Sequence, residues 1–325
     1  MHRILAAAPC AVCALCASVL AASDAQAQAQ YPTRSIRFIV PVTTGGPSDI
    51  VARLLGEKLA ASLGKPIIVD NRPGASNTVG AALVAKAEPD GHTLLMAAAN
   101  MATIQVLIKD LPFDPVKDFA AVSMTHLTPY VVVVSGQAPT KTLGELLKFV
   151  KGNSGKVTYG TTGPGSPQQL ATLLLTQVTG GMGNMTEVPY KGSSAAHPDL
   201  IGNRITFMID PLAAGAPHIR AGALRALAVT TRERNHSFPD VPTMSEAGVS
   251  GYDFASWGGV FVPAGTPRAV VQKLNAAIVE ALASPDIRKR FDDIGLEAKS
   301  STPDAFGKFL QTEITRWTAL LAKKP

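Results

Sequence analysis

Segments typical of β-strands and segments typical of α-helices alternate along most of the chain. In 35–42, Ile36, Phe38 and Val40 recur at every second position, and in 48–63 apolar residues recur at every fourth. Further strands are expected at 67–70, 93–97, 130–135, 156–160, 187–190, 205–210, 224–230 and 260–262, and further helices at 78–87, 143–151, 167–179, 267–283, 285–294 and 303–323. This alternation predicts an α/β fold with mostly parallel sheets, and a length of 325 residues favours two domains or one large one.

The N-terminal residues have the layout of a secretory signal peptide. Arg3 is followed by an apolar stretch at 4–22 and then by alanines that alternate with glutamines. Cleavage is expected after Ala27 or Ala29, so that 1–29 is a removable segment; an uncleaved membrane anchor is the alternative. No later stretch is long and apolar enough to cross a bilayer, so the mature chain is not expected to insert into a membrane.

All three cysteines of the chain, Cys10, Cys13 and Cys16, lie within this predicted signal peptide. Leu15 is larger than the small residue that usually precedes a lipidated cysteine, which argues against a lipoprotein. A mature chain without cysteine cannot form disulfides, thiolate nucleophiles or cysteine–metal sites. An exported chain of this kind fits a bacterial periplasm better than a small disulfide-stapled secreted domain.

The composition excludes several classes of protein. Apolar residues make up 46% of the chain and charged residues 17%, which is incompatible with a disordered chain. The net charge of +6 comes without a long run of lysine and arginine, and aromatic residues are only 6%. A nucleic-acid partner is therefore not expected, although the positive charge permits attraction to anions.

Two loops share one pattern, 41–49 and 159–167. Each runs from a predicted strand through Thr-Thr-Gly into a predicted helix. In the second loop, Ser166 is expected to cap the helix, Pro167 to fill its first position and Gln169 to complete a capping box. Ligands of open parallel sheets bind beyond the carboxyl ends of strands, where free N–H groups at a helix start attract anions. The pair of loops predicts a cleft for a small carboxylate; the alternative is that each loop is a glycine-rich turn without a ligand.

Asp49, in the first turn of the helix that follows the first loop, has three interpretations. Its charge can favour the helix dipole, or its carboxylate can fix the loop by accepting backbone N–H bonds. Direct contact with a ligand is the third, and it would suit an ammonium group because a second carboxylate would be repelled. We favour the loop-fixing role.

Motifs of enzymes are largely missing. The chain has no phosphate-binding Gly-x4-Gly-Lys-Ser/Thr motif and no Gly-x-Ser-x-Gly elbow, and the Ser-x-x-Lys match at 62–65 lies at a helix end without its companion motifs. Beyond the signal segment, the histidines are scattered without metal-ligand spacing: His92, His126, His197, His218 and His236. The sequence therefore predicts no catalytic residue, no metal and no cofactor; a triad assembled from distant segments is the alternative.

Several short motifs together resemble one family. They are Tyr31-Pro-Thr-Arg-Ser-Ile, 41–49, Asp70-Asn-Arg-Pro-Gly-Ala, Pro89-Asp-Gly-His-Thr-Leu, Val188-Pro-Tyr-Lys-Gly, Pro239-Asp-Val-Pro-Thr with Glu246 and Gly248, and Trp257-Gly-Gly through Pro263-Ala-Gly-Thr-Pro. The chain resembles the periplasmic solute receptors of tripartite tricarboxylate transporters, also called Bug receptors. The resemblance implies a type II periplasmic-binding-protein fold, in which two α/β lobes close on a small ligand.

The resemblance also implies which residues bind the ligand. Backbone and hydroxyl groups of both loops would hold a carboxylate, and three residues outside the loops are further candidates. The implied residues are Thr43, Thr44, Gly45, Gly46 and Asp49 in the first loop, Thr161, Thr162, Gly163, Gly165 and Ser166 in the second, and Tyr190, Lys191 and Asp210 elsewhere. Of these, Asp210 is equally well explained as a structural cap, and Lys191 is the one cation considered for a second carboxylate.

The expected organisation is a discontinuous pair of domains. The strand at 130–135 enters a second series of strands and helices, and the strand after Trp257 returns to the first. Domain 1 is predicted to combine 31–130 with 252–325, and domain 2 to span 131–251. The expected partners are a small carboxylate and the permease subunits of a tripartite transporter, and the protein is expected to be a monomer. The alternatives are a receptor for a membrane sensor kinase and a periplasmic enzyme acting on a small carboxylate.

Overall fold

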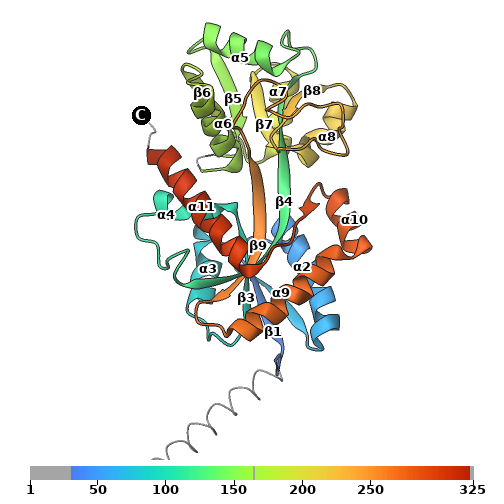
Figure 1. Ribbon diagram of the computed structural model, residues 1–325. Helices are drawn as coiled ribbons and strands as arrows, with labels where there is room; N and C mark the ends of the chain where they lie inside the picture. The colour runs from blue at the N-terminus through green and yellow to red at the C-terminus, as the bar shows by residue number, and fades with distance from the viewer. Residues whose placement is uncertain (1–30, 164, 323–325) are drawn as a thin grey trace, which may run out of the picture.

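The computed structural model describes residues 31–163 and 165–322. The predicted signal peptide, 1–29, lies outside the described residues. Strands and helices alternate, and they form two lobes connected by two long strands, β4 and β9 (Figure 1). The α/β fold with two lobes that the sequence predicts is confirmed. The prediction of mostly parallel sheets is wrong, because the long strand β4 pairs antiparallel with each of its neighbours and β9 pairs antiparallel with β3. Among the described helices, none is long and apolar enough to span a membrane.

The first lobe is built on a mixed sheet, with parallel β1, β2 and β3 at one side. Strand β1 pairs with both β2 and β3 in parallel, whereas β9 runs antiparallel to β3 and to β4. The strands of this sheet are β1 (Ile36–Val40), β2 (Ile67–Asn71), β3 (Thr93–Ala98), the first part of β4 (Phe119–Ser135), β9 (Ala255–Pro263) and β10 (Glu297–Ala298). Ile36, Phe38 and Val40 are all fully buried, so β1 is covered by helices and forms part of a core.

Helices cover both faces of this sheet. They are α2 (Pro47–Leu63), α3 (Thr78–Ala85), α4 (Ile104–Leu107), α9 (Arg268–Ala283), α10 (Pro285–Asp293) and α11 (Pro303–Ala322), with short 3₁₀ turns η1 (Ala75–Asn77) and η2 (Ala99–Ala102). Val51, Leu55 and Leu59 of α2 are fully buried in one core with Leu274 of α9. Helix α2 ends at Gly64, whose φ of 71° places it in the left-handed region expected for a helix terminator.

The second lobe carries a smaller sheet formed by the end of β4 and four further strands. These are β5 (Val157–Thr161), β6 (Met185–Pro189), β7 (Phe207–Pro211) and β8 (Leu224–Val229), and the helices are α5 (Leu143–Gly152), α6 (Pro167–Val178), α7 (Ser193–Ile201) and α8 (Leu212–Arg220). Strand β5 is parallel to β6 and β7, and β4 is antiparallel to β7 and β8.

Strand β4 connects the two sheets, and its length corrects the sequence prediction. It is 17 residues long and begins at Phe119, whereas the sequence predicted a strand only from residue 130. Up to Pro129 it pairs with β9, and from Tyr130 it pairs with β7 and β8, so the strand order passes from one sheet to the other through β4. The first half was missed because buried polar residues such as Ser123 and Thr125 interrupt its apolar pattern.

Helix α11 lies along the side of both lobes. It begins on the first lobe and extends toward α6 of the second lobe (Figure 1). Near its end, the Trp317 ring packs edge-on against Phe254 with ring centroids 5.8 Å apart, and Arg316 Nη2 donates to the Asp253 carbonyl at 2.6 Å. The last helix therefore closes one side of the region where β9 leaves the first lobe.

Candidate ligand-binding cleft

A cavity of about 550 Å³ lies between the lobes on the side covered by α11. Its walls come from η1, η2 and the end of β3 in the first lobe, from the start of α6 in the second, and from the connecting β9. The lining residues are Ser76, Asn77, Ala98, Ala99, Asn100, Thr162, Gly165, Ser166, Pro167, Leu170, Phe254, Ala255, Ser256, Glu313 and Trp317. The second Thr-Thr-Gly loop therefore lines this cavity, through Thr162, Gly165 and Ser166.

The second loop has the helix start that the sequence predicts, with one difference. Ser166 Oγ accepts a hydrogen bond from the Gln169 N–H at 3.3 Å, and Pro167 fills the first position of α6. The Gln169 side chain does not return to Ser166, as a capping box would require. Its Oε1 instead accepts the Gly165 N–H at 2.7 Å, because Gly165 has a φ of 75° that turns its N–H toward the helix.

A carboxylate from the neighbouring strand holds the second loop. Glu187, on β6, accepts the Thr161 hydroxyl at 2.7 Å through Oε1 and the Gln169 amide at 2.5 Å through Oε2. Thr161 is fully buried, and its Oγ1 also accepts the Gly163 N–H at 3.0 Å. Thr161 and Gly163 therefore shape the loop, whereas Thr162, whose hydroxyl donates to Gln168 at 3.0 Å, is exposed beside the cavity.

The first Thr-Thr-Gly loop is fixed by Asp49. The Asp49 side chain is buried; its Oδ2 accepts the Gly45 N–H at 2.9 Å and its Oδ1 accepts Asn71 Nδ2 at 2.9 Å. Asn71 also donates to the Val42 carbonyl at 3.1 Å. This is the loop-fixing contact favoured by the sequence analysis.

The charge of Asp49 is stabilised by these contacts. Burial acts to raise the pKa of Asp49, but hydrogen bonds from Arg53, Gly45 and Asn71 and the charge of Arg53 outweigh it, so the pKa is lowered. Thr43, Thr44 and Gly45 are exposed next to this anion, and neither they nor Gly46 are among the residues that line the cavity. The Asp49 carboxylate is therefore buried and bonded to protein donors, Gly45, Arg53 and Asn71.

The first lobe contributes residues that the sequence analysis did not single out. Ser76 and Asn77 line the cavity with positive φ angles of 54° and 76°, and Asn100 Nδ2 donates to the Ser76 carbonyl at 3.0 Å. Asparagine tolerates the left-handed region better than most residues. The available signal was the Pro-Gly dipeptide at 73–74, which indicates a turn just before them.

Asp210 is fully buried inside the second lobe and does not line the cavity. Its Oδ1 accepts the Ser193 hydroxyl at 2.5 Å, and its Oδ2 lies 2.8 Å from His197 Nε2. Asp210 thereby connects the end of β7 to helix α7. In this arrangement the carboxylate lies between the serine and the histidine, whereas a nucleophilic triad needs the histidine in the middle.

Tyr190 and Lys191 lie outside the cavity as well. The Tyr190 hydroxyl donates to Asp199 Oδ2 at 2.8 Å, and Asp199 also forms an ion pair with Arg204. Burial and the bond to Asp199 raise the pKa of Tyr190 to about 12. Lys191 is exposed at the start of the turn into α7. Within the described residues, no cluster of histidine, cysteine and acidic side chains could hold a metal ion.

Two α/β lobes joined by a pair of long strands, with a cavity between them, are the architecture of a periplasmic solute-binding protein. The chain belongs to the tripartite tricarboxylate transporter family of receptors, whose profile matches residues 51–325. The resemblance drawn from its motifs is thereby confirmed.

Relatives and solved structures agree with this assignment. The chain is 36% identical over 293 residues to protein BugT of Bordetella pertussis, covering 90% of this chain and 89% of BugT. It is 32% identical to the periplasmic binding protein BugD, with a TM-score of 0.72 over 90% of this chain and 98% of BugD. It is 34% identical to MatC from Rhodopseudomonas palustris, solved with bound malate, with a TM-score of 0.71 over 89% of this chain and 99% of MatC. A second R. palustris protein, solved with adipate, is 34% identical with a TM-score of 0.75 over 89% and 97% of the two chains.

Proposed function

We propose that this protein captures a small carboxylate in the cavity between its lobes and delivers it to a membrane transporter. The observation that carries the proposal is the start of α6, where Thr162, Gly165 and Ser166 line the cavity. A helix start with hydroxyl groups favours anions. The malate and adipate bound by relatives are both carboxylates, which supports the same class of ligand here.

The two loops contribute differently to the proposed site. The Gly165 N–H of the second loop is held by the neutral Gln169 amide, which in turn donates to the Glu187 carboxylate, whereas the Gly45 N–H of the first loop is held directly by the Asp49 carboxylate. We expect the ligand carboxylate to bind at the second loop. At the first loop it would be repelled by the Asp49 carboxylate, which is bonded directly to the loop backbone. The first-loop residues Thr43, Thr44, Gly45 and Gly46 would then approach from the opposite lobe when the lobes close.

The other candidate residues are assigned supporting roles. Asp49, Thr161, Gly163 and Asp210 would position the loops and helix α7, because each holds protein groups through the bonds described above. Tyr190 would support the same region through Asp199. Exposed Lys191 would contact a second carboxylate of the ligand.

The residues that line the cavity restrict which class of carboxylate would bind. Glu313 is the one charged side chain among the lining residues given above, and its Oε2 accepts Trp317 Nε1 at 2.9 Å while Arg316 lies 3.3 Å from its Oε1. Leu170, Phe254 and Trp317 add apolar surface to the lining. This combination suits a carboxylate with an apolar body better than a compact tricarboxylate, whose extra charges would meet neutral groups and a glutamate.

A thermal-shift screen of residues 30–325 against malate, adipate, citrate, benzoate and phenylacetate, followed by calorimetry, tests the proposal. We expect saturable binding of at least one carboxylate. Acids with an apolar body, such as adipate, benzoate and phenylacetate, should bind with higher affinity than citrate. Absence of binding across a wider carboxylate library would contradict it. Incubation with the best-bound acid and mass spectrometry should show no product, because Asp210 lies between Ser193 and His197 and no nucleophile–base pair results.

We also propose export to the periplasm and a transporter partner. The mass of the protein purified from a bacterial periplasm should lack residues 1–27 or 1–29 and all three cysteines. Crosslinking in intact cells should recover the membrane subunits of a tripartite transporter. Recovery of a sensor kinase instead would favour the alternative partner, and a periplasmic product that retains Cys16 would contradict the proposed cleavage.

The domain boundaries are the last part of this proposal. We propose that 31–130 with 252–325 form one folding unit and 131–251 the other, since β4 changes partners between Pro129 and Tyr130. Helix α11 would belong to the first unit while it packs on both. Limited proteolysis should then cut near these boundaries and leave 131–251 intact.

A further inference from the structure

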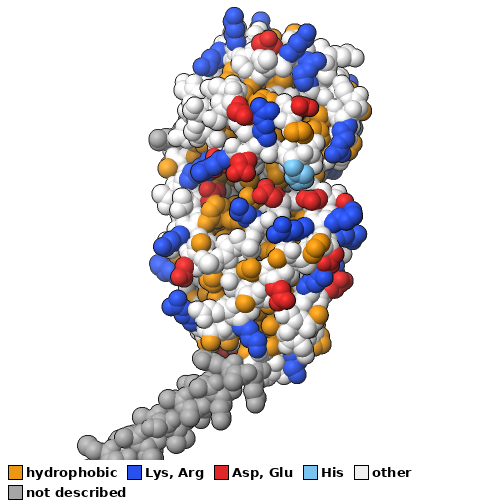
Figure 2. All heavy atoms as spheres, turned by 45° about the vertical axis from the view of Figure 1, so that its right-hand side comes forward, with side chains coloured by type: hydrophobic (Ala, Val, Ile, Leu, Met, Phe, Trp, Pro, Cys, Tyr) orange, Lys and Arg blue, Asp and Glu red, His pale blue; other side chains and the backbone are white. Residues whose placement is uncertain are grey.

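A second cavity, which we call the groove, lies between the lobes on the side away from the cleft. Its volume is about 220 Å³, and it is lined by α8 and the loop 235–238 of the second lobe and by the end of α10 with Gly295, Leu296 and Glu297 of the first. Figure 2 shows charged side chains of both signs gathered at mid-height of this face, between the lobes.

The groove and the cleft flank the same pair of strands. Pro129 of β4 and Ala255 of β9 are register partners where the strands leave the first lobe. Pro129 lines the groove, whereas Ala255 lines the cleft. Figure 1 shows α8 and α10 on one side of these strands and α6 with α11 on the other. A rotation of the lobes about β4 and β9 that narrows the cleft therefore widens the groove.

The lobes touch on both sides of this axis. On the groove side, Gly295 lies so close to α8 that an added Cβ would be 2.0 Å from Ala213 Cβ. On the cleft side, a Cβ added to Gly165 would be 2.7 Å from Leu107 Cδ1 of α4. Since packed atoms resist compression, each contact limits rotation in one direction.

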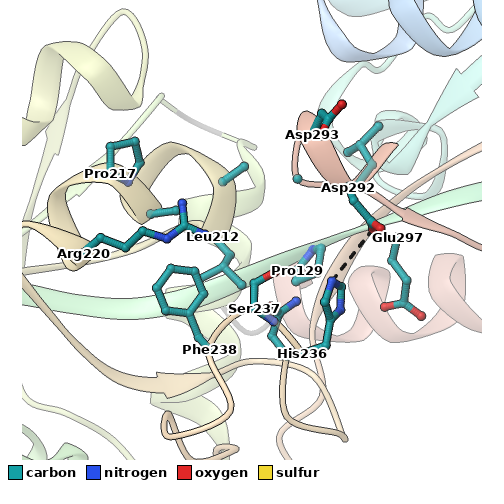
Figure 3. Close-up of a pocket in the computed structure, with 15 residues that line it drawn as sticks. Pro129, Leu212, Pro217, Arg220, His236, Ser237, Phe238, Asp292, Asp293 and Glu297 are labelled. Atoms are coloured by element: carbon teal, nitrogen blue, oxygen red, sulfur yellow. Dashed lines mark hydrogen bonds and ion pairs between the residues drawn. The ribbon is translucent and has the colours of Figure 1, made fainter. Parts of the chain in front are cut away.

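The walls of the groove carry opposite charges (Figure 3). Arg220, stacked at 5.1 Å from the Phe238 ring, and His236 project from the second lobe, and Asp292, Asp293 and Glu297 from the first. His236 Nε2 lies 4.0 Å from Asp292 Oδ1. These side chains are largely exposed, so their attraction is weak, but it favours a narrow groove.

We propose that the charged walls of the groove oppose closure of the cleft, that the Gly295–Ala213 contact limits its opening, and that the two together set the apparent affinity of the receptor. This inference rests on the proposed receptor function. The apparent affinity of a receptor scales with the fraction of molecules in the binding-competent arrangement. A larger residue at position 213 would push the lobes apart at the groove and so close the cleft. The cleft itself would keep all of its lining residues unchanged.

Two nitroxide labels across the groove measure this rotation directly. Chain 31–325 contains no cysteine, so Ala221→Cys on α8 and Arg290→Cys on α10 can be labelled selectively. Without ligand, Ala213→Trp should lengthen the distance between the labels, and Ala195→Trp, at an exposed position of α7, should leave it unchanged. Ala213→Leu gives a smaller wedge if the tryptophan variant does not fold. An unchanged distance in a folded Ala213 variant would overturn the inference.

Calorimetry with malate and adipate gives the second measurement. Ala213→Trp should tighten binding of whichever acid wild type binds by about threefold or more. Leu107→Ala removes the contact that limits closure on the cleft side, so it should also tighten binding. Equal affinities of wild type and Ala213→Trp would overturn the inference and leave the receptor function standing. If wild type binds neither acid, that result counts against the proposed function and not against the inference. The distances between the labels would then test the inference by themselves.

Discussion

The Gly45 N–H donates to Asp49 Oδ2 at 2.9 Å, and the same relationship recurs in the other lobe, where the Gly165 N–H donates to Gln169 Oε1 at 2.7 Å. In both loops a glycine with positive φ bonds to a side chain four residues later, in the first turn of the following helix. The two bonds differ in charge, since one acceptor is a carboxylate and the other an amide. This difference is the reason for placing the anionic end of a ligand at the second loop.

Asp49→Asn is expected to destabilise the protein by about 1–3 kcal/mol at pH 7, because a buried, multiply bonded charge is lost. The pKa of Asp49 is lowered in the folded state, so its contribution is present above the unfolded pKa and lost as pH falls through the folded pKa. The stability difference between wild type and variant should therefore shrink in acid. Urea unfolding at pH 7 and pH 3 measures it, with Asp304→Asn in the exposed first turn of α11 as control. A difference that grows in acid would contradict this role.

Gln169→Met should free the Gly165 N–H and loosen the second loop. The variant keeps the length of the side chain but removes the acceptor for Gly165 and the donor to Glu187. We expect faster hydrogen exchange at the Gly165 amide and carboxylate binding weakened about tenfold. Gln177→Met, at an exposed position of the same helix, is the matched control. Unchanged exchange at Gly165 would show that the Gln169 bond does not hold the loop.

Asp210→Ala separates a structural role from ligand contact. The substitution leaves the Ser193 hydroxyl and buried His197 without their acceptor, which should cost about 3 kcal/mol of unfolding free energy. Carboxylate affinity of the protein that remains folded should stay within about twofold of wild type. A large loss of affinity with little loss of stability would instead place Asp210 at the ligand.

Burial of His126 should make the stability of the protein decrease in acid, independently of the effect of Asp49. Burial lowers the pKa of His126 to about 4, so the unfolded chain binds a proton more readily between about pH 6.5 and pH 4. Stability from this group is full above that window and falls as pH drops through it, by up to about 3 kcal/mol. Thermal unfolding from pH 7 to pH 4 should show a smaller decline in His126→Gln. An equal decline would assign the effect to other groups.

The last three helices and the two crossings between the lobes were predictable from sequence, and the full length of the connecting strands was not. The helices expected at 267–283, 285–294 and 303–323 are present as α9, α10 and α11 with ends shifted by at most one residue, since proline and periodic apolar residues mark them. The first half of β4 was missed because Ser123, Thr125 and His126 are buried polar residues, and their burial depends on β9 and on Ser301. Local pattern cannot report a partner 178 residues away.

Some local contacts of the two loops were predictable, and others were not. The second loop, its cap and the buried role of Asp49 follow from local sequence, because their contacts span four residues or fewer. Glu187 and Asn71 hold the two loops from neighbouring strands, so they emerge only once the sheet order is known. Ser76 and Asn77 could not be assigned to the cavity from sequence, because their place in it depends on the positive φ angles of η1.

The central claim is that a carboxylate binds at the start of α6. It is tested most directly by calorimetric titration of the best-bound acid into Thr162→Val and Ser166→Ala, beside Thr186→Val at an exposed position on β6. Each hydrogen bond to a charged group contributes about 1.5–3 kcal/mol, so loss of the Ser166 hydroxyl, which accepts from Gln169 and keeps its own proton for a ligand, should weaken binding about tenfold to a hundredfold. The Thr162 proton is donated to Gln168, so Thr162→Val should weaken binding less. Thr186→Val should bind like wild type. If Thr162→Val and Ser166→Ala also bind like wild type, the ligand does not bind at the start of α6, whatever the loss of the Ser166 cap does to the melting temperature.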